Sequence, residues 1–309
     1  MQSRKIIVIT GPTATGKTAF AALLAKTAGG EVVSADSMQI YRHMDVGTAK
    51  PTAEDMLGVR HHMIDIIPPW EDYSVSRYVS DAGTCIDEIL GRGKLAVLAG
   101  GTGLYIDSLL SGRSFQAHGG AELRRKLEME YDDSGGEVML AKLSEVDPER
   151  AAILHTNDRK RIVRALEVYH LTGKTLSEHD RETKALPPRY DAIKYALAFS
   201  DRARLYRRID QRVDKMIRSG LEEEVRNLIE MGVSPTCTSM QAIGYKEMVR
   251  SILGHTSPNE AAEQIKMESR RYAKRQLIWF RRDKEVKWIM WKDEPDIERG
   301  VGEVLYETK

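Results

Sequence analysis

Cysteine is scarce in this sequence, and what the sequence lacks excludes several classes of protein. The two cysteines, Cys85 and Cys237, lie far apart and in no Cys-x-x-Cys pattern, so the sequence predicts neither a disulfide framework nor a zinc site. No apolar run approaches the length of a membrane span, and strand-like residues begin by Ile6, which leaves no room for a signal peptide. We therefore expect a cytoplasmic protein that is not held in a membrane.

A large excess of either charge is also absent. The 309 residues include 47 Lys and Arg against 46 Asp and Glu, which gives a formal net charge of +1. The net charge therefore does not indicate binding to nucleic acid, and any basic surface must be local. Hydrophobic residues make up 41% of the chain, which suits one large or two modest globular domains.

The most informative stretch is a glycine-bounded loop. Gly11–Thr18 (GPTATGKT) follows an apolar run, Ile6–Ile9, and precedes an alanine- and leucine-rich segment, Ala19–Ala25. Strand, loop and helix in this order, with the pattern G-x-x-x-x-G-K-[ST], predict a phosphate-binding P-loop. Its glycines allow several backbone N–H groups to converge, and the helix adds its positive dipole end. We expect Lys17 to reach the outer phosphates and Thr18 to hold Mg²⁺ or a phosphate oxygen.

A carboxylate follows the second predicted strand, Glu31–Ser34. Asp36 lies at the carboxyl end of that strand, the edge of an open α/β sheet at which ligands bind. Three roles are open to it: binding Mg²⁺ through water, accepting a proton from a nucleophile, or capping the next turn. The loop Gly47–Pro51 adds a free cation, Lys50, close to this region.

Two adjacent histidines, His61 and His62, fall in a further predicted strand, Arg60–Ile66. Neighbouring residues of a strand point to opposite faces of the sheet, so the pair cannot readily chelate one metal ion. We interpret both histidines as structural.

A second glycine-rich turn follows another strand. The sequence predicts a helix over Tyr73–Leu90 and a buried strand over Lys94–Ala99, which runs into Gly100–Tyr105. In a doubly wound sheet this turn lies beside the P-loop, on the same edge. Thr102 within it is open to two interpretations, a ligand contact or the cap of a tight turn.

The middle of the chain has a different character. Residues 121–180 show no strand signal and are rich in charged helix formers, which indicates an all-helical subdomain inserted into an α/β core. Within it, Asn157–Arg164 carries four basic side chains in the six residues that start at Arg159. Phosphate contact is one interpretation, and a solvated helix face is the other, which charge count alone favours.

Strand character returns over Ala192–Phe199, and Asp201 is then expected to cap a long helix. Three arginines on that helix are spaced four residues apart and share one face: Arg204, Arg208 and Arg212. Guanidinium groups bind diphosphate oxygens bidentately. Pairing with acidic neighbours such as Asp201, Asp210 and Glu222 is equally open.

The last strong feature is Gln264–Lys287, where nine Lys and Arg face three acidic residues. Tyr272, Trp279 and Phe280 are interleaved with them. Basic groups with aromatic residues suit a nucleic-acid backbone and unstacked bases. A strand over Val286–Trp291 follows.

Taken together, these stretches resemble one family, the tRNA dimethylallyltransferases (tRNA isopentenyltransferases). The motifs that match run in order from the first strand to past residue 280: Gly11–Thr18, Ser34–Tyr41 (SADSMQIY), Gly47–Pro51 (GTAKP), His61–Asp65 (HHMID), Tyr73–Val75 (YSV), Gly100–Tyr105 (GGTGLY), Asn157–Val168, Gly173–Thr175, Leu205–Arg212, Gly220–Val225 (GLEEEV), Gln241–Glu247 (QAIGYKE) and Lys274–Arg281. This ordered set is far more specific than a P-loop alone. Arg60 stands where many members have proline, and the zinc-finger spacing that the eukaryotic branch appends is absent, so the resemblance is to the bacterial type.

The resemblance implies transfer of a dimethylallyl group from dimethylallyl diphosphate to N6 of the adenosine 3′ of the tRNA anticodon, with Mg²⁺ as cofactor and release of diphosphate. It implies an α/β fold in which a P-loop kinase-like parallel sheet forms the catalytic core, residues 1–115 and 190–309. An all-helical insertion domain, residues 116–189, is implied to contact the anticodon stem-loop. We expect a monomer whose partners are tRNA and dimethylallyl diphosphate.

The resemblance also implies roles for individual residues. Asp36 is implied as the base that engages N6, with Lys17 and Thr18 completing the catalytic set. Thr18 is the implied magnesium ligand, together with Asp36 through water. The implied diphosphate contacts are Gly11, Thr13, Ala14, Thr15, Gly16, Lys17, Thr18, Arg208 and Arg212. The implied tRNA contacts are Asp36, Ser37, Met38, Gln39, Thr102, Arg124, Lys160, Arg161, Arg164, Gln241, Gly244, Lys274, Arg275, Gln276, Trp279 and Arg281.

Other activities remain open on the sequence. A P-loop kinase of a small molecule needs a lid with catalytic arginines and forms ADP from ATP. Isopentenyl transfer to free AMP or ADP is a second alternative, but a mononucleotide needs neither the helical insertion nor the basic, aromatic segment. A third is a nucleotide-gated RNA-binding protein without transfer chemistry, which Asp36 facing the P-loop disfavours weakly.

Overall fold

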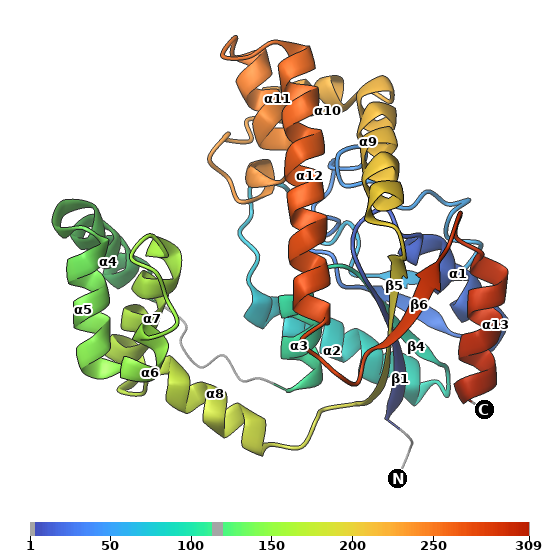
Figure 1. Cartoon of the computed structure of the whole chain (residues 1–309), viewed down its shortest axis with the longest axis horizontal. Coiled ribbons are helices and arrows are strands. Elements are labelled where there is room, and N and C mark those ends of the chain that lie inside the picture. The colour runs from blue at the N-terminus through green and yellow to red at the C-terminus, as the bar shows by residue number, and fades with distance from the viewer. Residues whose placement is uncertain (1–3, 113–119, 309) are drawn as a thin grey trace. The chain divides into compact units, whose positions relative to one another are not determined.

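A parallel sheet organises the larger part of the chain. The computed structural model describes residues 4–112 and 120–308, and within them six parallel strands are ordered β3-β2-β4-β1-β5-β6 (Figure 1). The strands are β1 Lys5–Thr10, β2 Glu31–Ser34, β3 His61–His62, β4 Ala96–Ala99, β5 Asp191–Phe199 and β6 Lys287–Trp291. The predicted α/β fold class is therefore confirmed.

The third strand is shorter than predicted. The sequence predicted a strand over residues 60–66, whereas β3 contains only His61 and His62. Met63 and Asp65 have positive φ angles of 65° and 56°. These angles lie outside the β region, so the backbone leaves the sheet directly after His62.

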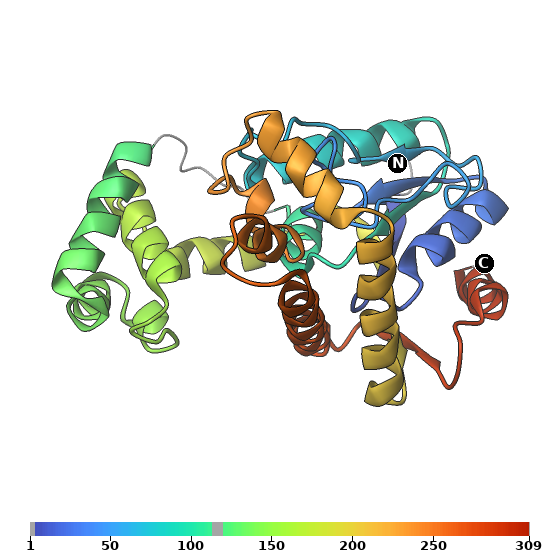
Figure 2. The same ribbon diagram turned by 90° about the horizontal axis from the view of Figure 1, so that it is seen from above.

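Helices cover both faces of this sheet. Those outside the helical insertion are α1 Lys17–Ala28, α2 Val75–Gly91, α3 Gly103–Leu110, α9 Arg202–Arg218, α10 Leu221–Glu230, the short 3-10 helix η1 Ser239–Gln241, α11 Tyr245–Ile252, α12 Pro258–Phe280 and α13 Ile297–Thr308. Helices α1 and α13 pack together on one face, and α2 and α3 on the other, as right-handed crossovers require (Figures 1 and 2). Helices α9 to α12 pack against one another near the carboxyl ends of the strands, and the last part of α12 extends back to α3.

The strands are apolar because both of their faces are covered. Ile7, Ile9 and Leu197 of the sheet are buried against Phe20 and Leu24 of α1. This packing fixes the sheet and leaves the carboxyl ends of β1, β2 and β4 to carry polar loops. No helix in the described ranges is long and apolar enough to cross a membrane.

Contacts divide the chain into two compact units, residues 1–110 with 190–309, and residues 111–189. The described part of the second unit consists of helices: α4 Ala121–Ser134, α5 Gly136–Val146, α6 Pro148–Ala151, α7 Arg159–Thr172 and α8 Leu176–Ala185. Leu127, Met139, Leu143 and Ile162 are buried in a core of its own. The predicted boundary between residues 115 and 116 lies outside the described residues.

Candidate active site

The P-loop forms where β1 meets α1, and its glycines are required by the backbone. Gly11 has a φ of 126°, and a Cβ there would lie 2.3 Å from the carbonyl oxygen of Leu197 in β5. Gly16, which caps α1, has a φ of 91°. Residues with side chains rarely adopt such angles, and a side chain at Gly11 would also push β5 away. The loop therefore packs closely against β5, and the amino end of α1 faces away from the sheet.

Two side chains from distant elements hold this loop from outside it. The indole N–H of Trp291, at the end of β6, donates to the carbonyl oxygen of Thr15 across 3.0 Å. On α12, the side-chain oxygen of Gln276 accepts from the Thr13 N–H at 2.9 Å, and its amide nitrogen donates to Gly101 O at 2.8 Å. Gln276 therefore bridges the P-loop and the second glycine-rich turn.

Gln276 has a structural role that the sequence did not indicate. The resemblance implied a tRNA contact, but the side chain is buried and both ends of its amide are occupied by backbone groups. Because a buried amide needs partners for its donor and acceptor, these bonds fix the two loops, and the implied tRNA contact stays a prediction.

Lys17 is enclosed at the amino end of α1. Its Nζ donates to Pro12 O at 2.7 Å. Burial, reinforced by the positive charge of Arg212 and opposed by the carboxylate of Asp36, lowers the pKa of Lys17 from 10.5 to about 7. Two cations thus lie close enough to repel each other, which favours a ligand that carries more than one negative charge.

The three arginines of α9 have separate roles. Arg204 pairs with Asp293 at 2.6 Å. Arg208 pairs with Glu294 and also donates to Ala14 O of the P-loop at 3.2 Å. The acidic partners therefore come from the loop after β6, and not from Asp201, Asp210 and Glu222 as the alternative interpretation expected.

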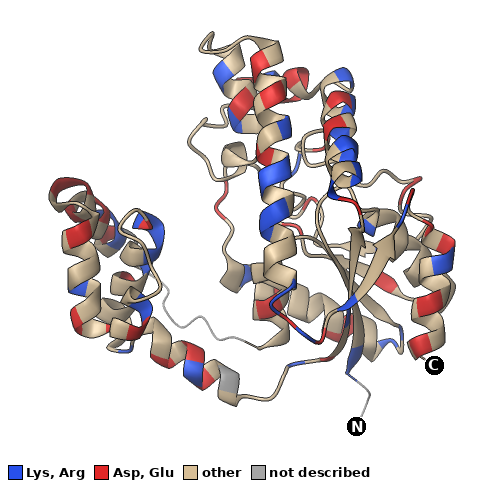
Figure 3. Cartoon of the chain, viewed as in Figure 1, with Lys and Arg blue, Asp and Glu red and all other residues tan. Residues whose placement is uncertain are grey.

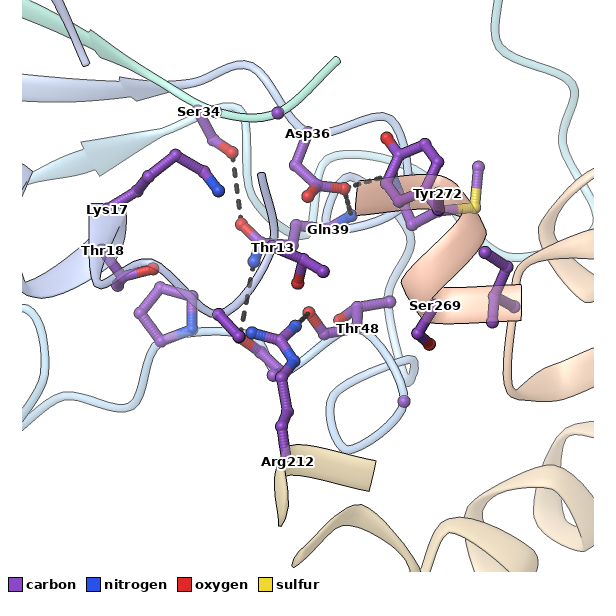
Figure 4. A pocket seen from close by; sticks show the side chains of 18 of the residues that line it. Thr13, Lys17, Thr18, Ser34, Asp36, Gln39, Thr48, Arg212, Ser269 and Tyr272 are labelled. Carbon is purple, nitrogen blue, oxygen red and sulfur yellow. Dashed lines mark hydrogen bonds between the residues drawn. The ribbon is translucent and has the colours of Figure 1, made fainter. Parts of the chain in front are cut away.

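Arg212 differs from the other two because it is directed into a pocket. Its guanidinium donates to Thr48 O at 3.3 Å, and burial lowers its pKa while Asp36 opposes that effect. Figure 4 shows its side chain rising from α9 toward the residues of the P-loop. Thr48 O is the one acceptor that this guanidinium has among the described residues, and a diphosphate would provide the anionic partner that it lacks there.

Asp36 follows β2, and its carboxylate faces the same pocket. Its Oδ1 accepts from Met38 N at 2.9 Å and from Gln39 N at 3.4 Å, which is a cap of the turn that follows. Its Oδ2 accepts no hydrogen bond from the part of the chain that the structure describes. Capping and proton transfer are therefore compatible, because each uses a different oxygen. Thr102, in the second glycine-rich turn, accepts from Ser37 N at 3.1 Å and supports this turn.

The cation of the loop at residues 47–51 is not free. The Lys50 side chain is 5% exposed, and its Nζ lies 2.5 Å from a carboxylate oxygen of both Asp45 and Asp65. It also donates to Tyr41 O at 2.9 Å. No local pattern in the sequence indicated these partners, which make Lys50 a support of the loop.

Of the two adjacent histidines, His62 belongs to a cluster of ion pairs, whereas His61 lines the cavity described below. His62 Nε2 lies 2.7 Å from Oε2 of the buried Glu31, which also pairs with Arg92 and Lys94. These three partners lower the pKa of Glu31 to about 2 in spite of burial. The cluster stabilises the start of β2, opposite the end that carries Asp36.

One cavity of about 960 Å³ joins most of these groups. Figure 4 shows Lys17 and Thr18 on one side of it, with Asp36 and Tyr272 on the other. The lining residues that the resemblance had singled out are Thr13, Ala14, Thr15, Gly16, Lys17, Thr18, Asp36, Ser37, Met38, Gln39, Arg208, Arg212, Gln241, Arg275 and Gln276. Those of the same unit that do not line it are Gly11, Thr102, Gly244, Lys274, Trp279 and Arg281.

Several lining residues were not proposed as ligand contacts from the sequence, among them Ser34, Thr48, Lys215, Ser269 and Tyr272. Tyr272 lies in the basic, aromatic segment, which was the available signal. Burial and the nearby Asp36 carboxylate raise the pKa of its hydroxyl to about 12, so it keeps its proton. Ser34 and Thr48 lie within the matched motifs Ser34–Tyr41 and Gly47–Pro51, and Ser269 lies in the basic, aromatic segment, so of these residues only Lys215 is outside every stretch singled out from the sequence.

The basic segment of α12 is less positive than its sequence suggests. Figure 3 shows its basic residues following a more acidic first part of the helix. Arg270 pairs with Asp210, and Lys266 with Asp214, both on α9. Among the residues implied to contact tRNA, Lys274, Arg275 and Arg281 are exposed, whereas Trp279 donates to Asp107 at 2.9 Å.

The helical unit has a basic group of its own. Arg124 of α4 and Arg164 of α7 both donate to one buried carboxylate, Glu167, at 3.0 Å and 2.7 Å. Lys160 and Arg161 at the start of α7 are exposed. Within Asn157–Arg164, Arg159 pairs with Asp132, Arg161 with Asp158 and Arg164 with Glu167. Phosphate contact by this segment stays a prediction.

A P-loop at the carboxyl edge of a parallel sheet, opening on a cavity with buried cations and a carboxylate, defines a phosphate-binding α/β protein of the P-loop class. A family model described as IPP transferase matches residues 39–283, and one described as isopentenyl transferase matches residues 4–67. The chain belongs to the IPP transferase family, which confirms the resemblance drawn from its motifs.

Individual relatives agree with this assignment. A tRNA dimethylallyltransferase of Acetivibrio thermocellus is 48% identical over 94% of this chain and 93% of its own length. The crystal structure of the tRNA isopentenylpyrophosphate transferase from Bacillus halodurans matches with a TM-score of 0.74 and 41% identity, over 99% of this chain and 96% of that one. A eukaryotic dimethylallyltransferase acting on tRNA matches with a TM-score of 0.82 and 26% identity, over 99% of this chain and 80% of that one.

Proposed function

We propose that this protein transfers a dimethylallyl group from dimethylallyl diphosphate to N6 of the adenosine 3′ of the anticodon in tRNA. One observation carries the proposal. The cavity that contains Lys17 and Arg212 also contains the Asp36 carboxylate, so groups for a diphosphate and for an amine nucleophile share one space. The names of the relatives, which are tRNA dimethylallyltransferases, support the same reaction.

The chemistry follows from these groups. N6 of the adenine forms a bond to C1 of the dimethylallyl group while the bond between C1 and the diphosphate oxygen breaks. The electron pair of the broken bond leaves with the diphosphate, where Lys17, Arg212 and the loop amides stabilise the growing charge. The N6 proton passes to Asp36, whose Oδ2 is the oxygen not used in the turn. An adenine stacked in an RNA loop must be flipped out to reach this carboxylate.

Magnesium fits this site as a partner of the substrate and not as a resident ion. Thr18 lines the cavity with an exposed side chain, and Asp36 provides a carboxylate, but the described residues contain no group of three or more His, Cys, Asp or Glu suited to a metal ion. Mg²⁺ usually keeps several waters and binds through one or two protein oxygens plus phosphates. Thr18 would hold it directly and Asp36 through water, and the ion would neutralise charge on the diphosphate.

Contact with tRNA is supported by two basic surfaces, one in each unit. In the helical unit these are Lys160 and Arg161, with Arg124 and Arg164 held by Glu167. In the larger unit they are the exposed Lys274, Arg275 and Arg281. We further propose that the enzyme acts as a cytoplasmic monomer.

One assay separates this reaction from its alternatives. The protein is incubated with unmodified tRNA, Mg²⁺ and labelled dimethylallyl diphosphate, and in parallel reactions with AMP or ATP in place of tRNA. We expect label in the adenosine next to the anticodon and one diphosphate released per transfer. Label on AMP alone would indicate a mononucleotide prenyltransferase, and ADP formation from ATP would indicate a kinase.

A further inference from the structure

The loop of residues 44–50 is held by a carboxylate from outside the cavity. Glu224, in the first turn of α10, accepts from the N–H groups of Asp45 and Val46 at 2.7 Å each, through Oε2. Its Oε1 accepts from Gly47 N at 3.0 Å. Three consecutive backbone N–H groups that converge on one anion form a nest, which binds a carboxylate more strongly than a neutral acceptor.

A tyrosine completes this arrangement. The hydroxyl of Tyr245, which is fully buried, donates to Glu224 Oε1 at 2.6 Å. A Cβ on Gly47 would lie 2.4 Å from the Tyr245 ring, so the loop and the ring are in direct contact only because residue 47 is glycine. The four donors to Glu224, three backbone N–H groups and the Tyr245 hydroxyl, are therefore all fixed in position.

At the other end of the same loop, two residues that line the cavity accept hydrogen bonds through their carbonyl oxygens. Thr48 O accepts from the Arg212 guanidinium at 3.3 Å, and Ala49 O accepts from Gln39 Nε2 at 3.4 Å. Gly47, Thr48 and Ala49 line the cavity, whereas Glu224 does not. Glu224 therefore binds the backbone of Gly47, and the next residue, Thr48, accepts from Arg212.

We propose that Glu224 is a positioning residue that fixes the orientation of Arg212 toward the diphosphate through the loop of residues 44–50. This inference rests on the proposed function, in which Arg212 stabilises the diphosphate. Only a carboxylate fits the position, because the nest and Tyr245 present four donors to two oxygens. A glutamine would turn its NH₂ group toward one set of these donors and leave it without acceptors.

The test compares Glu224→Gln with Glu223→Gln. Glu223 lies in the same helical turn and is exposed, so both variants remove one negative charge from the start of α10. Binding of inorganic pyrophosphate with Mg²⁺ is measured by calorimetry, and thermal unfolding is recorded for each variant. We expect Glu224→Gln to weaken pyrophosphate binding about tenfold, equal to about 1.4 kcal/mol, and Glu223→Gln to change it less than twofold.

A double-mutant cycle assigns the effect to Arg212. In an Arg212→Lys background, which lacks the planar fork that contacts Thr48 O, Glu224→Gln should cost less than twofold. A residue that only stabilises the fold would lower the unfolding temperature and leave this coupling at zero. Equal losses in both backgrounds, or unchanged binding in Glu224→Gln, would overturn the inference.

A less disruptive variant, Tyr245→Phe, tests the same coupling if Glu224→Gln does not fold. Tyr245→Phe removes one donor to Glu224 while keeping the ring against Gly47, and we expect a two- to threefold loss that also disappears in the Arg212→Lys background. No loss in Tyr245→Phe would count against the inference. Transfer to tRNA is assayed alongside: a wild-type protein that binds pyrophosphate but transfers nothing refutes the proposed function, and leaves the coupling of Glu224 to Arg212 to be judged on binding alone.

Discussion

The indole of Trp291 donates its N–H to the carbonyl oxygen of Thr15 at 3.0 Å, joining the last strand of the sheet to the P-loop. Replacing Trp291 by Phe keeps an aromatic ring but leaves the buried Thr15 carbonyl without this donor. We expect the free energy of unfolding to fall by about 1–3 kcal/mol, measured by urea denaturation. Pyrophosphate binding should weaken as well, because the loop loses a support.

Trp288→Phe is the matched control for this prediction. Trp288 lies on the same strand and is only partly buried. If Trp291→Phe lowers stability but binds pyrophosphate as tightly as the wild type, then the indole supports the fold and not the loop.

Asp36 can be tested with a variant that preserves its turn. Asparagine is as good a cap as aspartate, so Asp36→Asn keeps an acceptor for Met38 N but removes the proton acceptor. We expect the rate of transfer to fall by about 10²- to 10⁴-fold, with tRNA affinity nearly unchanged. Asp36→Ala should lose at least as much activity and some stability. Near-normal transfer in Asp36→Asn would show that another group takes the N6 proton.

The lowered pKa of Lys17 predicts a pH dependence of ligand binding. Below its pKa of about 7 the side chain is an ammonium ion that attracts phosphate, and above it the neutral amine predominates. Pyrophosphate affinity of the wild type should therefore decline relative to Lys17→Arg as the pH rises from 6 to 8.5. Arginine stays charged throughout, and the ionisation of the ligand itself is common to both proteins. Parallel pH profiles would show that Lys17 remains charged across this range.

The exposed cation Lys160 provides a test of the helical unit. Lys160→Ala should weaken tRNA binding and reduce the slope of log affinity against log salt concentration by about one, because one phosphate contact is lost. Lys142→Ala is the control, since Lys142 pairs with Glu130 in the same unit and is not among the implied contacts. An unchanged slope in Lys160→Ala would remove this residue from the tRNA surface.

The sequence predicted those parts of the fold and the site that depend on local pattern. The P-loop, the strand that precedes Asp36 and the helix capped by Asp201 each follow from residues within one or two turns of each other. The family assignment followed from the order of such motifs along the chain.

The remaining features depend on contacts between residues that are distant in the sequence. Gln276 and Thr13 are 263 residues apart, and Glu224 and Asp45 are 179 apart. A glutamine in a basic helix or a glutamate in an acidic turn carries no local sign of such a partner. Lys50 was expected to be free for the same reason, since Asp65 comes close to it only in the folded chain.

The supports of the P-loop have a consequence for the order in which the protein is made. Gly11 packs against Leu197. Thr13 donates a hydrogen bond to Gln276, and Thr15 accepts one from Trp291. A ribosome synthesises the loop before all three partners, the last of which follows Thr15 by 276 residues. The P-loop of a nascent chain therefore lacks these three supports until β5, α12 and β6 have been synthesised in turn.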